Sequence, residues 1–165
     1  MTPARNQFLK IAAAAALFAV AGVLVWRFLQ EDGGVSERAF FYDQSEQKLF
    51  VADRGLVPPI QGINDATEDG VRAVVVSTNG RPDDRRTWVV AYLETCTPEL
   101  KRQLMAARAA GTPPEIGRTA AQSLRLVRRP QDADWVALTT PEGERIVSEW
   151  VTAGPGDSQP VVCTP

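Results

Sequence analysis

An unbroken apolar run near the N-terminus constrains this chain more than any other feature of its sequence. Every residue in 11–26 is apolar or small, and the run extends over 8–29 if Lys10 and Arg27 turn their charged ends toward lipid headgroups. The extended run has 22 residues, and a helix needs about 20 to span a bilayer. We therefore predict that residues 8–29 contact the lipid bilayer, and that 1–30 form a cytoplasmic N-terminus and a transmembrane anchor.

Two other interpretations of this run are less favourable. A cleaved signal peptide would end at a small-residue site, and residues 19–22, Ala-Val-Ala-Gly, resemble one. Cleavage there would leave the apolar Val-Leu-Val-Trp at the new N-terminus, so a retained anchor fits better. A buried core helix is disfavoured because residues 11–26 have no polar face.

The charges around the run predict its orientation. Arg5 and Lys10 precede it without any acid, whereas Glu31, Asp32 and Glu37 follow it. The positive-inside rule then places the N-terminus in the cytoplasm and the remainder outside. We expect a single-pass protein of the inner (cytoplasmic) membrane with a linker over 31–38 and an extracytoplasmic, periplasmic domain over 39–165.

The composition of the exterior segment excludes one class of partner. Three of the eighteen Lys and Arg precede residue 31, so fifteen remain beside all twenty acids, a net charge of −5. Nucleic-acid binding needs a basic surface, so we expect no nucleic-acid partner. An acidic domain also has no reason to approach anionic headgroups.

The two cysteines predict a disulfide. Outside the cytoplasm an even number of cysteines usually pairs, and Cys163 lies two residues from the C-terminal Pro165. A bond from Cys96 to Cys163 would hold that end of the chain and contribute about 4 kcal/mol on the chain-entropy model. A redox site is disfavoured because no second cysteine follows Cys96 at the required spacing.

The pattern of residues 39–165 predicts an α+β fold, a small mainly antiparallel sheet with one packed helix. Apolar and β-branched runs predict strands, and Thr97 with Pro98 predicts a capped helix start that Gly111 ends. The segment 53–70 has no periodicity and is expected to be a long irregular loop. The predicted strands are 39–43 and 48–52, 71–78 and 87–94, and a hairpin over 123–140; the helix is 98–110, a shorter helix begins at Pro141 although Gly143 weakens it, and 161–163 forms a last strand beside Cys96.

No catalytic constellation is apparent. The chain has no histidine, which removes the usual general base and the commonest metal ligand. The acidic segment 64–70 suggests a calcium loop, but counting from Asp65 places Val76 at the position that needs a bidentate glutamate. We expect no catalytic residue, no metal and no cofactor. A pair of acids at glycosidase spacing could still form, because distance in space is not visible in a sequence.

One stretch is locally basic. Arg118, Arg125, Arg128 and Arg129 lie in a segment without acids between Ile116 and Gln131. They could bind an acidic envelope protein partner. The alternative is that they line the wet side of a strand and pair with neighbouring acids, as most charge runs do.

Five segments together resemble an uncharacterised family of bacterial single-pass membrane proteins with a small exterior domain. They are FFYDQSEQKLFVA, VPPI, GVRAVVVST, AYLETCTPELKRQL and PEGERIV, and the resemblance covers most of 39–165. It implies an envelope location and no particular activity. Pilin-like subunits are similar only in outline, since residues 5–15 contain neither the glycine nor the glutamate of their processing site.

These observations favour a non-catalytic, membrane-anchored binding or structural module of the bacterial cell envelope. The alternatives are a carboxylate-dependent envelope hydrolase and a minor subunit of a secretion or pilus-like assembly.

Overall fold

The chain divides into two compact units, residues 1–35 and 36–165, in a computed structural model that describes 17–26, 36–64, 67–152 and 158–165. Residues 17–26 are helical with exposed side chains. Within the described ranges, no helix is both long enough and apolar enough to cross a membrane. Parts of the predicted anchor (8–29) and linker (31–38) lie outside the described residues, and both stay predictions.

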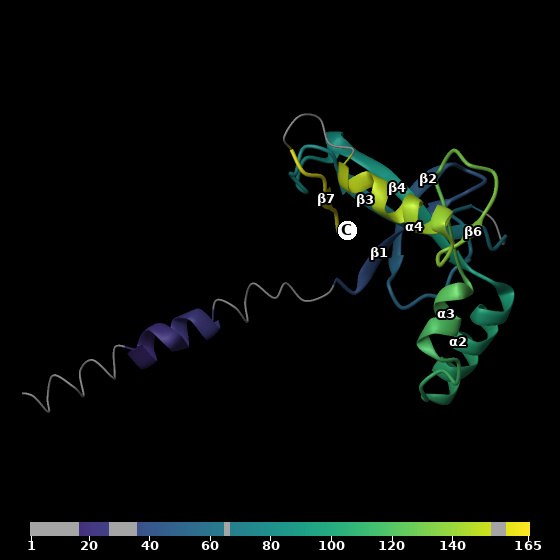
Figure 1. Cartoon of the computed structure of the whole chain (residues 1–165), viewed down its shortest axis with the longest axis horizontal. Helices are drawn as coiled ribbons and strands as arrows, with labels where there is room; N and C mark the ends of the chain where they lie inside the picture. Colours follow the sequence, from purple (N-terminus) through teal and green to yellow (C-terminus); the bar gives the residue numbers. More distant parts are fainter. Residues whose placement is uncertain (1–16, 27–35, 65–66, 153–157) are drawn as a thin grey trace, which may run out of the picture. The chain divides into compact units, whose positions relative to one another are not determined.

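The second unit is an α+β domain with a mainly antiparallel sheet, as its sequence predicts (Figure 1). The strands are β1 (Arg38–Asp43), β2 (Lys48–Asp53), β3 (Gly70–Ser77), β4 (Trp88–Cys96), β5 (Arg125–Arg128), β6 (Val136–Ala137) and β7 (Val161–Val162). The helices are α2 (Pro98–Ala110), α3 (Arg118–Ser123) and α4 (Pro141–Glu149), with 3₁₀ turns η1 (Arg85–Thr87) and η2 (Trp150–Thr152).

The strands lie in the order β2-β1-β3-β4-β5-β6, and β7 pairs with β3. All the pairings are antiparallel. Residues paired directly opposite one another point to the same face of a sheet. One face therefore carries a continuous row across the domain: Phe50, Phe41, Arg72, Glu94, Val127 and Val136.

The opposite face holds an apolar cluster. Its buried members are Phe40, Val71, Ala73, Val75, Leu93 and Cys163, and Trp88 and Trp135 pack against them. The rings of Phe40 and Trp88 meet edge to face with centroids 5.4 Å apart, a favoured aromatic geometry. The near-continuous apolar character of β3 follows from this arrangement, because β3 contributes to the core on both faces.

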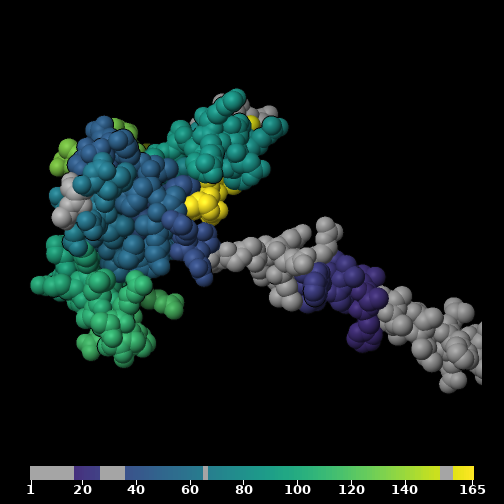
Figure 2. Space-filling model, turned by 180° about the vertical axis from the view of Figure 1, so that it is seen from behind, coloured from purple at the N-terminus to yellow at the C-terminus, as the bar shows by residue number. Residues whose placement is uncertain are grey.

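The sheet carries more helix than the single packed helix predicted from the sequence. Helix α4 packs against β5 with further contacts to β4 and β6, and it buries Gly143 and Ile146. Helix α2 has the predicted bounds but buries only Leu100. Figures 1 and 2 show α2 and α3 extending together beyond one end of the sheet.

The predicted disulfide is not formed, because Cys96 and Cys163 are both free and buried in this structure. Cys96 ends β4, whereas the backbone N–H of Cys163 donates to Val75 of β3. Strand β4 occupies one side of β3 at Val76 and Ser77, so β7 lies on the other side. By the register Cys96 falls opposite Gly70, five positions from Val75, or about 16 Å at 3.3 Å per residue. A disulfide needs Cα atoms within about 7 Å, and the expectation that residues 161–163 lie beside Cys96 is wrong.

Candidate functional site

The irregular segment after β2 is held to the domain through its own backbone carbonyls. We call residues 54–59 the strap. Side chains from β3, β4 and α2 donate to five of its carbonyl oxygens, which satisfies backbone groups that no strand or helix partner reaches. Arg72 donates to Arg54 and Leu56 (2.5 and 3.2 Å), Arg108 to Gly55 (2.7 Å), the Cys96 thiol to Pro58 (2.9 Å), and Lys101 to Pro59 (2.6 Å).

A cavity of about 240 Å³ lies between the strap, the sheet and helix α2; we call it the α2 pocket. Its polar lining residues are Arg54, Arg72, Glu94, Thr95 and Arg125. Its remaining lining is mainly apolar and includes Leu56, Val57, Leu100, Leu104, Leu126, Val127 and Leu138, together with Cys96. A concave apolar site with a few convergent polar groups is the usual form of a small-ligand site.

The electrostatics of the pocket centre on Arg72. Burial lowers the pKa of Arg72, the nearby Glu94 opposes that shift, and Arg54 and Arg125 add to it. The Arg72 guanidinium also lies 5.6 Å from the centroid of the Phe41 ring, a cation–π contact. Arg72 therefore remains charged, half-buried and close to two further cations.

Glu94 lies directly opposite Arg72 across β3 and β4. Its neighbour on the same strand face, Tyr92, has its pKa raised to about 12, first by burial and then by the charge and hydrogen bonding of Glu94. The Tyr92 hydroxyl consequently stays protonated at neutral pH. With three arginines and one carboxylate, the lining has a net charge of +2 in a domain that is acidic as a whole.

Cys96 lines the pocket as a thiol. Burial raises its pKa, and the opposing effects of Lys101 and Arg125 are smaller. The thiol is a nucleophile only when it is deprotonated. Its raised pKa and its hydrogen bond to Pro58 therefore favour a packing role for Cys96.

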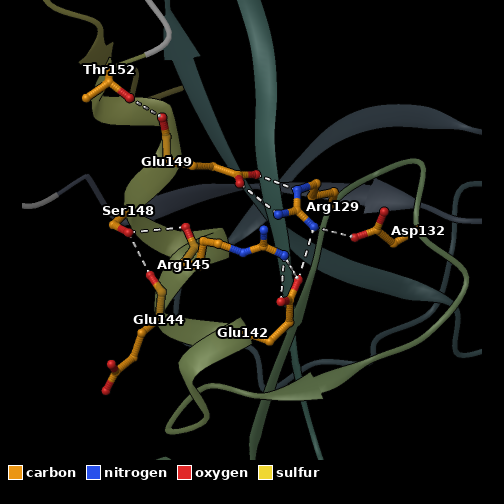
Figure 3. Close-up of polar contacts among 8 residues, drawn as sticks. All are labelled: Arg129, Asp132, Glu142, Glu144, Arg145, Ser148, Glu149 and Thr152. Carbon is orange, nitrogen blue, oxygen red and sulfur yellow. Dashed lines mark hydrogen bonds and ion pairs between the residues drawn. The ribbon is translucent and has the colours of Figure 1, made fainter.

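The structure separates the four arginines that the sequence suggested as one docking face. Only 19% of the Arg129 side chain is exposed. It forms ion pairs with Glu149, Asp132 and Glu142 (Figure 3). Both carboxylate oxygens of Glu149 accept from it, with Nη2 at 2.7 Å. These hydrogen bonds raise the pKa of Arg129 and tie α4 to the end of β5.

The other three arginines have different surroundings. Arg128 lies over the Trp135 ring with its guanidinium carbon 4.8 Å from the centroid. It also donates to the Gln44 side chain (2.8 Å) and to the Asp132 carbonyl. Arg118 begins α3 and is exposed. Only Arg125 lines the α2 pocket, so the structure does not place the four on a single surface.

The acidic segment before β3 contacts the β1–β2 turn through Asp69, whose carboxylate accepts from the Ser45 backbone N–H (3.1 Å). A second acid holds the same turn. Asp43, almost fully buried, accepts from the backbone N–H groups of Glu46 and Ile63 and from the Ser45 hydroxyl. Those backbone bonds come first among the causes that lower its pKa. Asp65, the first residue of the calcium pattern, lies outside the described residues. Among the described residues, no group of three or more potential ligands could hold a metal ion.

Sequence reasoning did not single out Arg72 or Glu94. The pattern that could have found them is a lone charge within each of two strands that otherwise read as apolar, VRAVVVST and TWVVAYLE. A charge in such a strand needs a partner or a purpose. Comparisons with protein-family models, with characterised proteins and with solved structures found no match for this chain.

Proposed function

We propose that this protein is a membrane-anchored binding module of the bacterial cell envelope, and that the α2 pocket is its ligand site. The observation that carries the proposal is the pocket itself, a concave apolar site lined by three arginines and one glutamate. Helix α2, which buries only Leu100, forms one wall of it. The apolar run over 8–29 and the acids that follow it support the anchor and the exterior location of the domain.

The geometry gives the alternatives less support. Each of three pockets is lined by a single carboxylate, Glu94 in the α2 pocket, Glu115 in the cavity along α2, and Glu68 in the cavity beside Trp135. A glycosidase-like mechanism needs two carboxyl groups facing one substrate. Among the residues of the domain that the structure describes, no contact specifically favours a subunit of a secretion or pilus-like assembly.

Protease protection tests the anchored topology. Protease added to intact spheroplasts of a bacterium that expresses the full-length chain should degrade a C-terminal epitope tag and spare an N-terminal one. An epitope tag at the C-terminus that survives until the membrane is lysed would exclude the exterior location.

Native mass spectrometry tests the pocket as the ligand site. The full-length protein, purified gently from membranes of its own host, should carry an adduct that is lost in Leu104→Trp, because the larger side chain fills the cavity. Met105→Trp is the matched control, since Met105 is the next residue of α2 and is 47% exposed. An adduct that persists equally in both variants would place the ligand elsewhere.

A further inference from the structure

We propose that the α2 pocket binds a short aliphatic monocarboxylate, with its carboxylate against Arg72 and Arg125 and its chain against Leu100 and Leu104. This inference rests on the proposed function and specifies the chemical class of the ligand. It follows from three features of the pocket: unpaired positive charge, a half-buried guanidinium with unused donors, and an apolar wall of limited volume.

The three pocket arginines differ in burial: Arg72 is half-buried, whereas Arg54 and Arg125 are exposed. Arg129 and Lys101 each form an ion pair with a carboxylate, at 2.5 to 3.5 Å. Across the described residues, no ion pair joins an acid to Arg54, Arg72 or Arg125 within 4.0 Å. Glu94 lies nearby, but the pocket lining keeps a net charge of +2. This charge favours an anion, and the guanidinium fork fits a carboxylate with two parallel hydrogen bonds.

Arg72 has donors to spare. Its two hydrogen bonds to the strap both use Nη2. Nε and Nη1 make no hydrogen bond within the part of the chain that the structure describes, and their group lies half-buried beside the cavity. A carboxylate here would meet a partly desolvated, preorganised cation, and such interactions are stronger than the same contact in water.

The apolar wall argues for a ligand with an aliphatic part. Leu100 and Leu104 lie one helical turn apart on α2 and face the cavity together with Leu138. Inorganic phosphate would leave this wall in contact with water. The cavity of about 240 Å³ is small, so it favours a short aliphatic chain, for which hexanoate is a suitable probe.

Glu94 determines whether Glu94→Gln should raise or lower the affinity for a charged ligand. Its carboxylate shares the pocket with the three arginines and lies opposite Arg72, so it repels a bound anion. Removing that charge should tighten the binding of a carboxylate and weaken the binding of a cation. A site for an ammonium or a guanidinium ligand would show the reverse.

Isothermal titration calorimetry on the full-length protein in mild detergent tests the proposal with three probes of equal chain length: sodium hexanoate, hexan-1-ol and hexylammonium chloride. We expect hexanoate to bind at least tenfold more tightly than either of the others. Arg125→Gln should weaken hexanoate about tenfold, the size of one lost charged hydrogen bond, and Glu94→Gln should tighten it about threefold. Arg118→Gln is the matched control, because Arg118 is exposed on α3 outside the pocket lining, and it should leave binding unchanged.

Three results would overturn the proposal, and they differ in what they say about the module. Equal binding of hexanol and hexanoate, or preference for hexylammonium, would exclude the anion while keeping the pocket as a ligand site. Tighter binding of N-acetyl-leucine than of hexanoate would replace a free aliphatic acid by a peptide C-terminus. If hexanoate does not bind but the native adduct is still lost in Leu104→Trp, only the ligand class is rejected. If hexanoate does not bind and no adduct depends on Leu104, the proposed function is rejected as well.

Discussion

Helices α2 and α4 begin with the same three residues, Thr-Pro-Glu, yet they have different relations to the sheet. In both helices the threonine side chain accepts from a backbone N–H three residues later, Leu100 in α2 and Gly143 in α4. The cap alone therefore does not decide how a helix packs. Helix α2 has thirteen residues and buries one of them, whereas α4 has nine and buries two.

The difference arises from what each helix meets after its first turn. In α4, Gly143 lies directly against the backbone carbonyls at the end of β6. Glu142 and Glu149 reach Arg129 from two turns of the helix (Figure 3). In α2 the contacts run to the strap through Arg108 and Lys101. Helix α4 is thus part of the core, while α2 forms one wall of a pocket.

The largest expected effect is on α4. An alanine at position 143 would place its Cβ 2.9 Å from the Leu138 carbonyl oxygen and closer still to that of Ala137, so the helix must move off the sheet. We expect Gly143→Ala to lower the free energy of unfolding by at least about 2 kcal/mol, despite the better helix propensity of alanine. Urea unfolding of the full-length protein, followed by tryptophan fluorescence, measures it.

Gly117→Ala is the matched control for that experiment. Gly117 precedes α3, and an added Cβ there has no atom within 4 Å. Because Gly117 is the N-cap of α3, where glycine is preferred to alanine, the substitution should cost no more than about 1 kcal/mol. Equal effects of the two substitutions would mean that α4 is no more closely packed than the α2–α3 region.

The ion pairs of α4 should have the next largest effect. Arg129→Gln removes the charge that joins Glu149, Glu142 and Asp132, and we expect a loss of about 2 kcal/mol, since hydrogen bonds to charged groups contribute about 1.5–3 kcal/mol. Arg102→Gln on the exposed side of α2 is the control and should cost less than about 0.5 kcal/mol. A loss for Arg129→Gln no greater than the control would show that the network is solvated and contributes little.

The comparison also shows which parts of the domain a sequence can predict. Caps, strand periodicity and the loops between strands are local, so β1 to β4 and α2 have nearly their predicted bounds, and β5 with β6 forms the hairpin predicted over 123–140. The α2 pocket depends on Arg72 and Glu94, which lie 22 positions apart in the chain and come together only through the register of β3 with β4. The disulfide prediction failed for the same reason, because the partner of β7 is a matter of topology.

The predicted arginine surface also failed because sequence neighbours need not share a face in the fold. A run of four basic residues predicted one surface, but β5 alternates its side chains between the two faces of the sheet. Val127 and Arg125 share the face of the α2 pocket, whereas Arg128 lies over Trp135. The alternative prediction, pairing with neighbouring acids, is correct for Arg129.

Removing the two caps separates local from global stability. Thr140→Ala should lower the global free energy of unfolding by about 1 kcal/mol, the usual contribution of such a cap, because α4 cannot unwind without exposing Ile146. Thr97→Ala removes an equivalent hydrogen bond, but α2 can open locally while the sheet persists. We expect a smaller global effect and faster hydrogen exchange of α2 amides, and equal global losses would contradict this view of α2.

The smallest effect is a pH dependence that belongs to α4. Hydrogen bonding by Arg145, with a further contribution from Arg129, lowers the pKa of Glu142 below its usual value near 4.5. A carboxyl group whose pKa is lower in the folded state contributes stability above the unfolded pKa, and that contribution is lost as the pH falls through the folded value. Between pH 6 and pH 3, Glu142→Gln should therefore lose less stability than the unsubstituted protein, and at pH 6 it should already be the less stable of the two. The difference between their urea midpoints at the two pH values measures this contribution. A constant difference across the range would mean that Arg145 and Arg129 do not stabilise the Glu142 carboxylate, and that the first turn of α4 is held by the Thr140 cap and by packing at Gly143.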